Sequence, residues 1–157
     1  MIPTASADLP ELVPIAGRTC GECTMCCKLP AIPELNKKGG EWCTHCSTRK
    51  RCDSYDTRPD SCRRFYCHFM LSDVLDEAWR PSNARFMIMS KITNGQKIAM
   101  IVVDPPRPDA WRREPYYSTF KLWAEKVRVV VNIGRRQIEI FPTHENDLGE
   151  MPEEMAP

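Results

Sequence analysis

The residues of this chain that could do chemistry are nine cysteines, all confined to the segment between Cys20 and Cys67. They are arranged as Cys20-x2-Cys23-x2-Cys26-Cys27, then Cys43-x2-Cys46, and finally Cys52, Cys62 and Cys67. Thiolates are soft ligands that suit Zn²⁺ and iron–sulfur clusters, and a C-x2-C turn brings two sulfurs to one ion. The clustering therefore predicts that zinc, an iron–sulfur cluster or disulfide bonds hold these thiols together.

Two features favour a metal over disulfides. Met1 to Pro10 contain neither a basic patch nor a long apolar stretch, so we expect no secretory signal peptide. The expected compartment is then the cytoplasm, where thiols stay reduced. An odd number of cysteines would also leave one unpaired in a disulfide framework. We therefore treat all nine cysteines as candidate metal ligands.

The spacing leaves zinc and an iron–sulfur cluster both open. Two C-x2-C pairs separated by a loop are typical of zinc sites, whereas the dense run from Cys20 to Cys27 has part of the spacing of bacterial ferredoxins. Nine cysteines would fill two four-ligand sites with one to spare, so the number of centres stays open too. His45 and His68 lie among the cysteines, and with enough sulfurs present we expect both to be exposed or outside the coordination sphere.

Basic residues outnumber acidic ones around the cysteines. A zinc ion held by four thiolates carries a net charge of −2, so nearby cations would lower thiol pKa values and stabilise the centre. Arg58, Arg63 and Arg64 lie within four positions of Cys62, and we expect them to supply this charge. The basic residues between Cys20 and Cys67 are Lys28, Lys37, Lys38, Arg49, Lys50, Arg51, Arg58, Arg63 and Arg64.

The segments that must position the cysteines contain few apolar residues. Residues 1–19 read as a loose lead-in, and residues 20–79 as a metal-binding module that ends in a helix over 59–79. Ordering about 50 residues costs roughly 1–2 kcal/mol of backbone entropy each, which so small a core does not offset. We therefore expect this module to be poorly ordered without its metal.

The rest of the chain predicts an α+β region over residues 80–143. Thr93-Asn94-Gly95-Gln96 is a strong hairpin signal between two alternating or apolar segments. We predict a mostly antiparallel four-stranded sheet with one or two helices. Residues 144–157 are acidic and contain two prolines, and we expect them to be disordered. The predicted strands span 84–92, 97–103, 127–133 and 137–141, and the predicted helix spans 116–126.

Two linked motifs resemble a known family. The run Cys20-Gly21-Glu22-Cys23-Thr24-Met25-Cys26-Cys27 resembles the CxxCxxCC signature of the YkgJ-type zinc- or iron-chelating proteins. The segment from Cys52 to Cys62 resembles that family's C-x2-Y-x2-R-P-x2-C element, and Cys67 follows where another cysteine is expected. The resemblance implies metal chelation and no particular reaction. The family pattern has eight cysteines, which makes Cys43 or Cys46 the extra one here.

Metal chelation is thus the leading function, and two alternatives stay open. One is an iron–sulfur or thiol-dependent redox enzyme or electron carrier; the other is a nucleic-acid-binding zinc module, in which Trp111-Arg112-Arg113 would contribute. A net charge of +1 argues against nucleic acid as a partner, and a protein partner is open. The longest apolar run, Ile98 to Val103, is too short to span a bilayer. No catalytic triad or H-E-x-x-H motif accompanies the cysteines, so we assign no catalytic residue.

Overall fold

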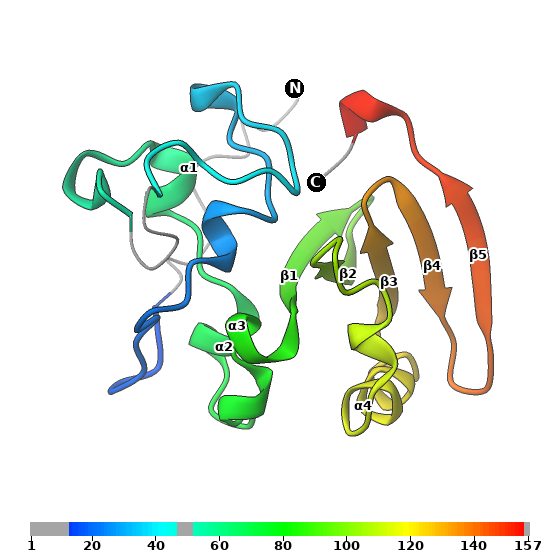
Figure 1. Cartoon of the computed structure of the whole chain (residues 1–157). Coiled ribbons are helices and arrows are strands. Elements are labelled where there is room, and N and C mark those ends of the chain that lie inside the picture. The colour runs from blue at the N-terminus through cyan, green and yellow to red at the C-terminus, as the bar shows by residue number, and fades with distance from the viewer. Residues whose placement is uncertain (1–12, 47–51, 156–157) are drawn as a thin grey trace, which may run out of the picture.

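The chain folds around a five-stranded sheet, with the cysteine-rich region packed beside β1 (Figure 1). The computed structural model describes residues 13–46 and 52–155. The strand order is β1-β2-β3-β4-β5, and β5 forms the edge farthest from the cysteines. The strands are β1 Phe86–Thr93, β2 Gln96–Val103, β3 Arg128–Ile133, β4 Arg136–Ile140 and β5 Glu145–Glu150.

The predicted α+β class and hairpin are confirmed, and the sheet is mostly antiparallel as expected, but it has five strands rather than four and one of its strand pairs is parallel. Asn94 and Gly95 have φ values of 51° and 73°, which the tight turn between β1 and β2 requires. β2 and β3 pair in parallel. A parallel pair needs a crossover, and here it consists of loops, the 3₁₀ turn η5 Ala110–Arg112 and the helix α4 Tyr116–Trp123.

The acidic segment expected to be disordered instead provides the fifth strand. Its carboxylates lie opposite arginines at the start of the neighbouring strand: Arg135 binds Glu150 at 2.7 Å, and Arg136 pairs with Asp147. Glu145, at the start of β5, accepts two hydrogen bonds from Arg112 at 2.7 and 2.8 Å. These arginines offset the repulsion between the acidic residues of the segment, so the segment can form a strand.

The predicted helix over residues 59–79 is also wrong, because the segment breaks into short turns. A single guanidinium stabilises the irregular backbone of residues 69–75: Arg18 Nη1 donates to the backbone carbonyls of Phe69, Ser72 and Leu75 at 2.6 to 3.0 Å. These carbonyls would otherwise be left without partners at helix ends. Within the described ranges, no helix is long and apolar enough to cross a membrane. The short elements of the cysteine-rich region are η1 Met25–Cys27, η2 Pro33–Leu35, η3 Tyr55–Thr57, α1 Asp60–Arg63, α2 His68–Leu71, η4 Glu77–Trp79 and α3 Pro81–Ala84, and η6 Glu153–Met155 follows β5.

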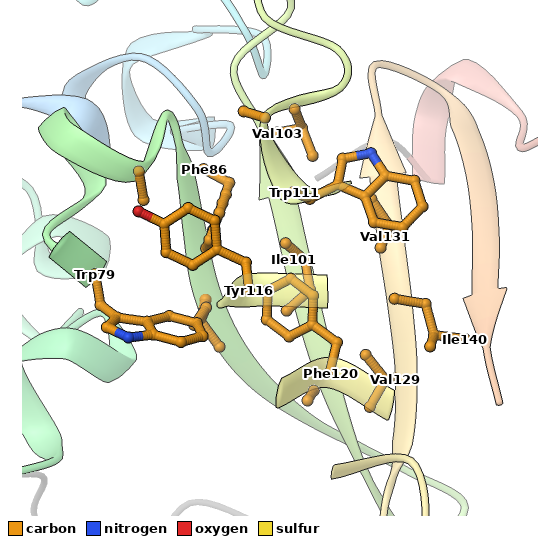
Figure 2. Close-up of a cluster of buried hydrophobic side chains, with 14 of the residues drawn as sticks. Trp79, Phe86, Ile101, Val103, Trp111, Tyr116, Phe120, Val129, Val131 and Ile140 are labelled. Atoms are coloured by element: carbon orange, nitrogen blue, oxygen red, sulfur yellow. The ribbon is translucent and has the colours of Figure 1, made fainter. Parts of the chain in front are cut away.

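An aromatic cluster fills the core on the face of the sheet that α4 covers (Figure 2). The ring of Tyr116 lies 4.8 Å from that of Trp79 and 4.9 Å from that of Phe86, centre to centre, in edge-to-face geometry. Phe120 is fully buried beside them, and the Tyr116 hydroxyl donates to the carbonyl of Ala78 at 2.6 Å. This core ties η4 to α4 and β1, so it fixes the position of the segment that follows the last cysteine.

A second, smaller core attaches the cysteine-rich region to the opposite face of the sheet. Met25 and Leu29 pack against Met87 of β1 and Val102 of β2, and all four are buried. Alternate residues of a strand point to opposite faces. Phe86 therefore contributes to the aromatic core while its neighbour Met87 contributes to the smaller one.

A buried carboxylate joins the same two regions electrostatically. Asp104, which follows β2 and is fully buried, accepts a hydrogen bond from Lys28 Nζ at 2.6 Å and another from Arg85 Nη2 at 2.5 Å. Lys28 follows Cys27 directly and is itself buried. The carboxylate thus holds the first cysteine loop against the end of a sheet strand.

Asp104→Asn should destabilise the protein by about 3 kcal/mol or more, because it leaves the buried Lys28 ammonium without its carboxylate. Urea unfolding followed by circular dichroism measures the change in the free energy of unfolding. Asp109→Asn is the matched control, since Asp109 is 85% exposed and lies 3.8 Å from Arg112. Equal effects of the two substitutions would contradict a structural role for the buried pair.

Candidate metal centre

The first four cysteines lie on two consecutive tight turns. The backbone N–H of Cys23 donates to the carbonyl of Cys20 at 3.0 Å, and that of Cys27 donates to Thr24 at 2.8 Å. Gly21 has a φ of 55°, which suits glycine and lets the first turn close. Because Met25 is anchored in the smaller core, the thiols on this loop are held at the surface of the sheet.

The remaining cysteines are brought to this loop by backbone pairing and by the break in the predicted helix. Cys43 donates its N–H to the carbonyl of Cys27 at 2.9 Å, and Cys46 donates to Cys43 at 3.0 Å. Cys62 lies on α1, whereas Cys67 is the extended residue that precedes α2. On one continuous helix, five residues would separate Cys62 and Cys67 by about 140°. The break between α1 and α2 removes this constraint.

One cavity of about 900 Å³ brings most of the cysteines together. All nine are free thiols. Cys46 does not line the cavity; it is buried and lies close to Cys27, with which it shares a hydrogen bond. The cysteines that line the cavity are Cys20, Cys23, Cys26, Cys27, Cys43, Cys52, Cys62 and Cys67.

The thiols face a common space without forming a finished coordination sphere. Among the described residues, no group of three or more Cys, His, Asp or Glu side chains is arranged to hold a metal ion. The donor set is nevertheless the soft, sulfur-rich kind that zinc and iron–sulfur clusters take. Binding would require the thiols to move toward a common point and to lose their protons.

Mutual proximity and burial keep several of these thiols protonated. A hydrogen bond with Cys26, together with burial, raises the pKa of Cys27 far above its usual range. Burial, followed by the charges of Cys27 and Cys43, raises the pKa of Cys62. Burial also raises the pKa of Cys67 to about 11. So many thiols could not ionise together without positive charge to compensate.

The cations nearest to the thiols are only partly those expected. Lys37 Nζ donates to the carbonyls of Lys28 and Pro30 at 2.8 and 2.6 Å. Burial lowers the pKa of Lys37, and the nearby Cys43, Cys27 and Cys62 oppose that effect. Lys37 could not be singled out from its spacing, because it lies ten positions after Cys27 and six before Cys43.

Arginines flank the other end of the cysteine set. Arg80 Nη1 donates to the carbonyls of Thr19 and Cys20 at 2.9 and 2.7 Å. Burial and Cys23 raise the pKa of Cys20, while Arg80 and Arg58 lower it. The expected proximity of Arg58 is thus confirmed, and Arg80 is an addition that lies 13 residues beyond the last cysteine.

Arg63 and Arg64, the other two arginines expected near the thiols, are exposed. Arg63 donates to the backbone carbonyls of Arg58 and Asp56, so it stabilises its own turn. Neither Arg63 nor Arg64 lines the cavity. Of the other basic residues counted in the sequence, Arg49, Lys50 and Arg51 lie outside the described residues.

The two histidines differ in their relation to the cavity. His45 lines it, and its Nδ1 lies 3.0 Å from the Ser54 hydroxyl oxygen. His68 does not line it and packs edge-on against Trp123, with ring centres 6.1 Å apart. His45 therefore lies where a histidine next to a metal site would lie, and His68 belongs to the packing around the core.

Comparisons with family models, with curated proteins and with solved structures found no match for this chain. The resemblance to the YkgJ-type proteins therefore depends on the two cysteine motifs alone and stays a prediction. The convergence of the cysteines on one cavity is a separate observation, which does not depend on that resemblance.

The raised pKa of Cys67 predicts a loss of stability of the metal-free, reduced protein at high pH. The unfolded thiol ionises near 9.0, whereas the folded thiol ionises near 11. The stabilisation is therefore complete below pH 9 and is lost as the pH rises toward 11, by roughly 2–3 kcal/mol. Urea unfolding across this range, compared with Cys67→Ala, tests this; an identical pH dependence of the two proteins would contradict it.

Proposed function

We propose that this protein is a metal-chelating protein that binds zinc, or iron as an iron–sulfur cluster, through its cysteine cavity. The observation that carries the proposal is the convergence of eight free thiols, from segments spread over 48 residues, on one cavity. Cysteines so concentrated, and kept free of disulfides, are characteristic of metal sites. A bound metal would crosslink these segments, and its binding free energy would appear as folding free energy.

The eight cavity-lining cysteines are the proposed ligands, and Cys46 is the proposed extra one. Cys46 is buried behind the cavity wall and shares a hydrogen bond with the Cys27 thiol. In that position it would orient Cys27 rather than bind metal itself. This assignment also matches the eight-cysteine pattern of the family that the sequence resembles.

The surrounding charges support an anionic metal–thiolate centre. Lys37 lies near three of the proposed ligands, and Arg58 and Arg80 both act on Cys20. Each cation would offset part of the negative charge that the thiolates acquire on binding. The three come from separate parts of the sequence, so the fold has brought them to the same cluster.

The two alternative functions are less well supported by the same geometry. Thiol-dependent catalysis requires an accessible thiol of low pKa, whereas burial raises the pKa values of Cys62 and Cys67. The Trp111-Arg112-Arg113 segment is poorly suited to nucleic acid: Trp111 is fully buried, and Arg112 pairs with Glu145. Redox chemistry at an iron–sulfur cluster would remain compatible with the cavity.

Protein purified without oxygen should contain stoichiometric metal that is released only by a strong chelator or by acid. Elemental analysis and a visible absorption spectrum distinguish the two metals: zinc gives a colourless protein, whereas iron with acid-labile sulfide and bleachable visible bands indicates a cluster. Metal-free protein that neither zinc nor iron with sulfide can reconstitute would refute the proposal.

Cys62→Ser should lower the bound metal per chain by at least half and loosen the cysteine-rich region, because it removes one proposed ligand. Cys46→Ser is the matched control and should retain the wild-type metal content. Elemental analysis gives the stoichiometry, and limited proteolysis reports order between residues 20 and 67. Equal metal loss in both variants would show that the proposed ligand set is wrong.

A further inference from the structure

The four cysteines of the first loop do not share one direction. Cys20, Cys23 and Cys26 repeat every three residues, whereas Cys27 lies outside that repeat. Cys26 and Cys27 both belong to the 3₁₀ turn η1, in which consecutive side chains leave the axis about 120° apart. The turn therefore presents these two thiols to different sides of the loop. A hydrogen bond between them shows that the two sides adjoin.

Cys67 belongs with the thiols of the first turn. It packs with Cys23 against the smaller core. Burial raises the pKa of Cys67 most, and the charges of Cys20 and Cys23 raise it further. Arg80 is the cation beside these thiols, because its Nη1 donates to the carbonyl of Cys20 at 2.7 Å. Cys20, Cys23 and Cys67 thus form one group, which we call the outer group because Cys20 is exposed.

A second group of thiols surrounds Cys27. The backbone N–H of Cys43 donates to the carbonyl of Cys27 at 2.9 Å. Burial raises the pKa of Cys62, and the charges of these two thiols and of Cys52 raise it further. Lys37 is the cation of this group: burial lowers its pKa, and three of the four thiols oppose that effect. We call Cys27, Cys43, Cys52 and Cys62 the inner group, because Cys43 is buried.

The cations divide the thiols in the same way as the backbone does. Lys37 donates to the carbonyls of Lys28 and Pro30, on the chain that leaves Cys27. Arg80 donates instead to the carbonyls of Thr19 and Cys20, where the first turn begins. Each group of thiols therefore has a separate source of positive charge, which a separate thiolate centre would need.

From this division we propose that the cysteines form two four-sulfur metal centres rather than one. Four thiolates are the ligand set of a structural zinc site and also of a four-iron cluster. Cys26 completes the outer centre, because it continues the spacing of the first turn and lines the same cavity. The inference depends on the proposed function and adds the number of centres. The outer centre would consist of Cys20, Cys23, Cys26 and Cys67, and the inner centre of Cys27, Cys43, Cys52 and Cys62.

The test uses the full-length protein with its metal replaced by cadmium, whose NMR spectrum gives one signal for each distinct site. We expect two cadmium ions per chain and two signals. Total metal is measured first, on the native protein and after the exchange. A protein that binds no metal would refute the proposed function itself. A protein that saturates at one cadmium ion would refute only the division into two centres.

Three double variants, each lacking two thiols, separate the centres. Cys20→Ser with Cys23→Ser should halve the bound metal, abolish one signal and leave the other unchanged. Cys52→Ser with Cys62→Ser should abolish the other signal and preserve the first. The matched control, Cys20→Ser with Cys62→Ser, removes one thiol from each centre and should alter both signals.

The outer double variant decides the matter should the inner one fail to fold, since it removes the exposed thiol of Cys20 and leaves the buried Cys43 in place. One unchanged signal in that variant, with neither unchanged in the mixed control, supports two centres. Equal effects of the outer variant and the mixed control on the two signals would overturn the inference while leaving metal chelation intact.

Discussion

The position of the cysteine-rich region relative to the sheet depends on the ion pairs that the buried carboxylate of Asp104 makes. Two cations from separate segments, Lys28 and Arg85, bind its two oxygens. Lys28 belongs to the loop that carries four cysteines, whereas Arg85 precedes the first strand. Because a buried charge is tolerated only with its partners in place, the three side chains fix the cysteine loop relative to the sheet before any metal is considered.

The two regions are stabilised by different means. The sheet and α4 enclose an aromatic core centred on Phe86, Tyr116 and Phe120, which needs no ligand to exclude water (Figure 2). The cysteine-rich region has only the small cluster around Met25 and Leu29, together with backbone turns and charge pairs. Its thiols are close enough to raise one another's pKa values. The proposed metal would convert this unfavourable crowding of thiols into a set of bonds.

Sequence patterns predicted the parts of this structure that depend on neighbouring residues. The Asn94-Gly95 turn and the alternating segments on either side of it gave the β1–β2 hairpin, and Tyr116 with Phe120 indicated α4. Patterns could not show the parallel β2–β3 pair, because a crossover depends on distant packing. They also missed β5, whose acidic residues need Arg112, Arg135 and Arg136 as partners. The cysteines of the candidate site could be identified from their spacing. Lys37 and Arg80 could not, because only the folded structure places them near the thiols.

Strand β1 forms part of both interiors at once, which constrains how this protein can vary. Phe86 and Ile88 face the aromatic core, while Met87 and Met89 line the cysteine cavity. Inserting or deleting one residue near the start of this strand would exchange the two sets, moving sulfur-bearing side chains into the core and aromatic ones toward the thiols. The register of this strand is therefore fixed by two separate interiors, whereas β4 contributes to the aromatic core alone, through Ile138 and Ile140.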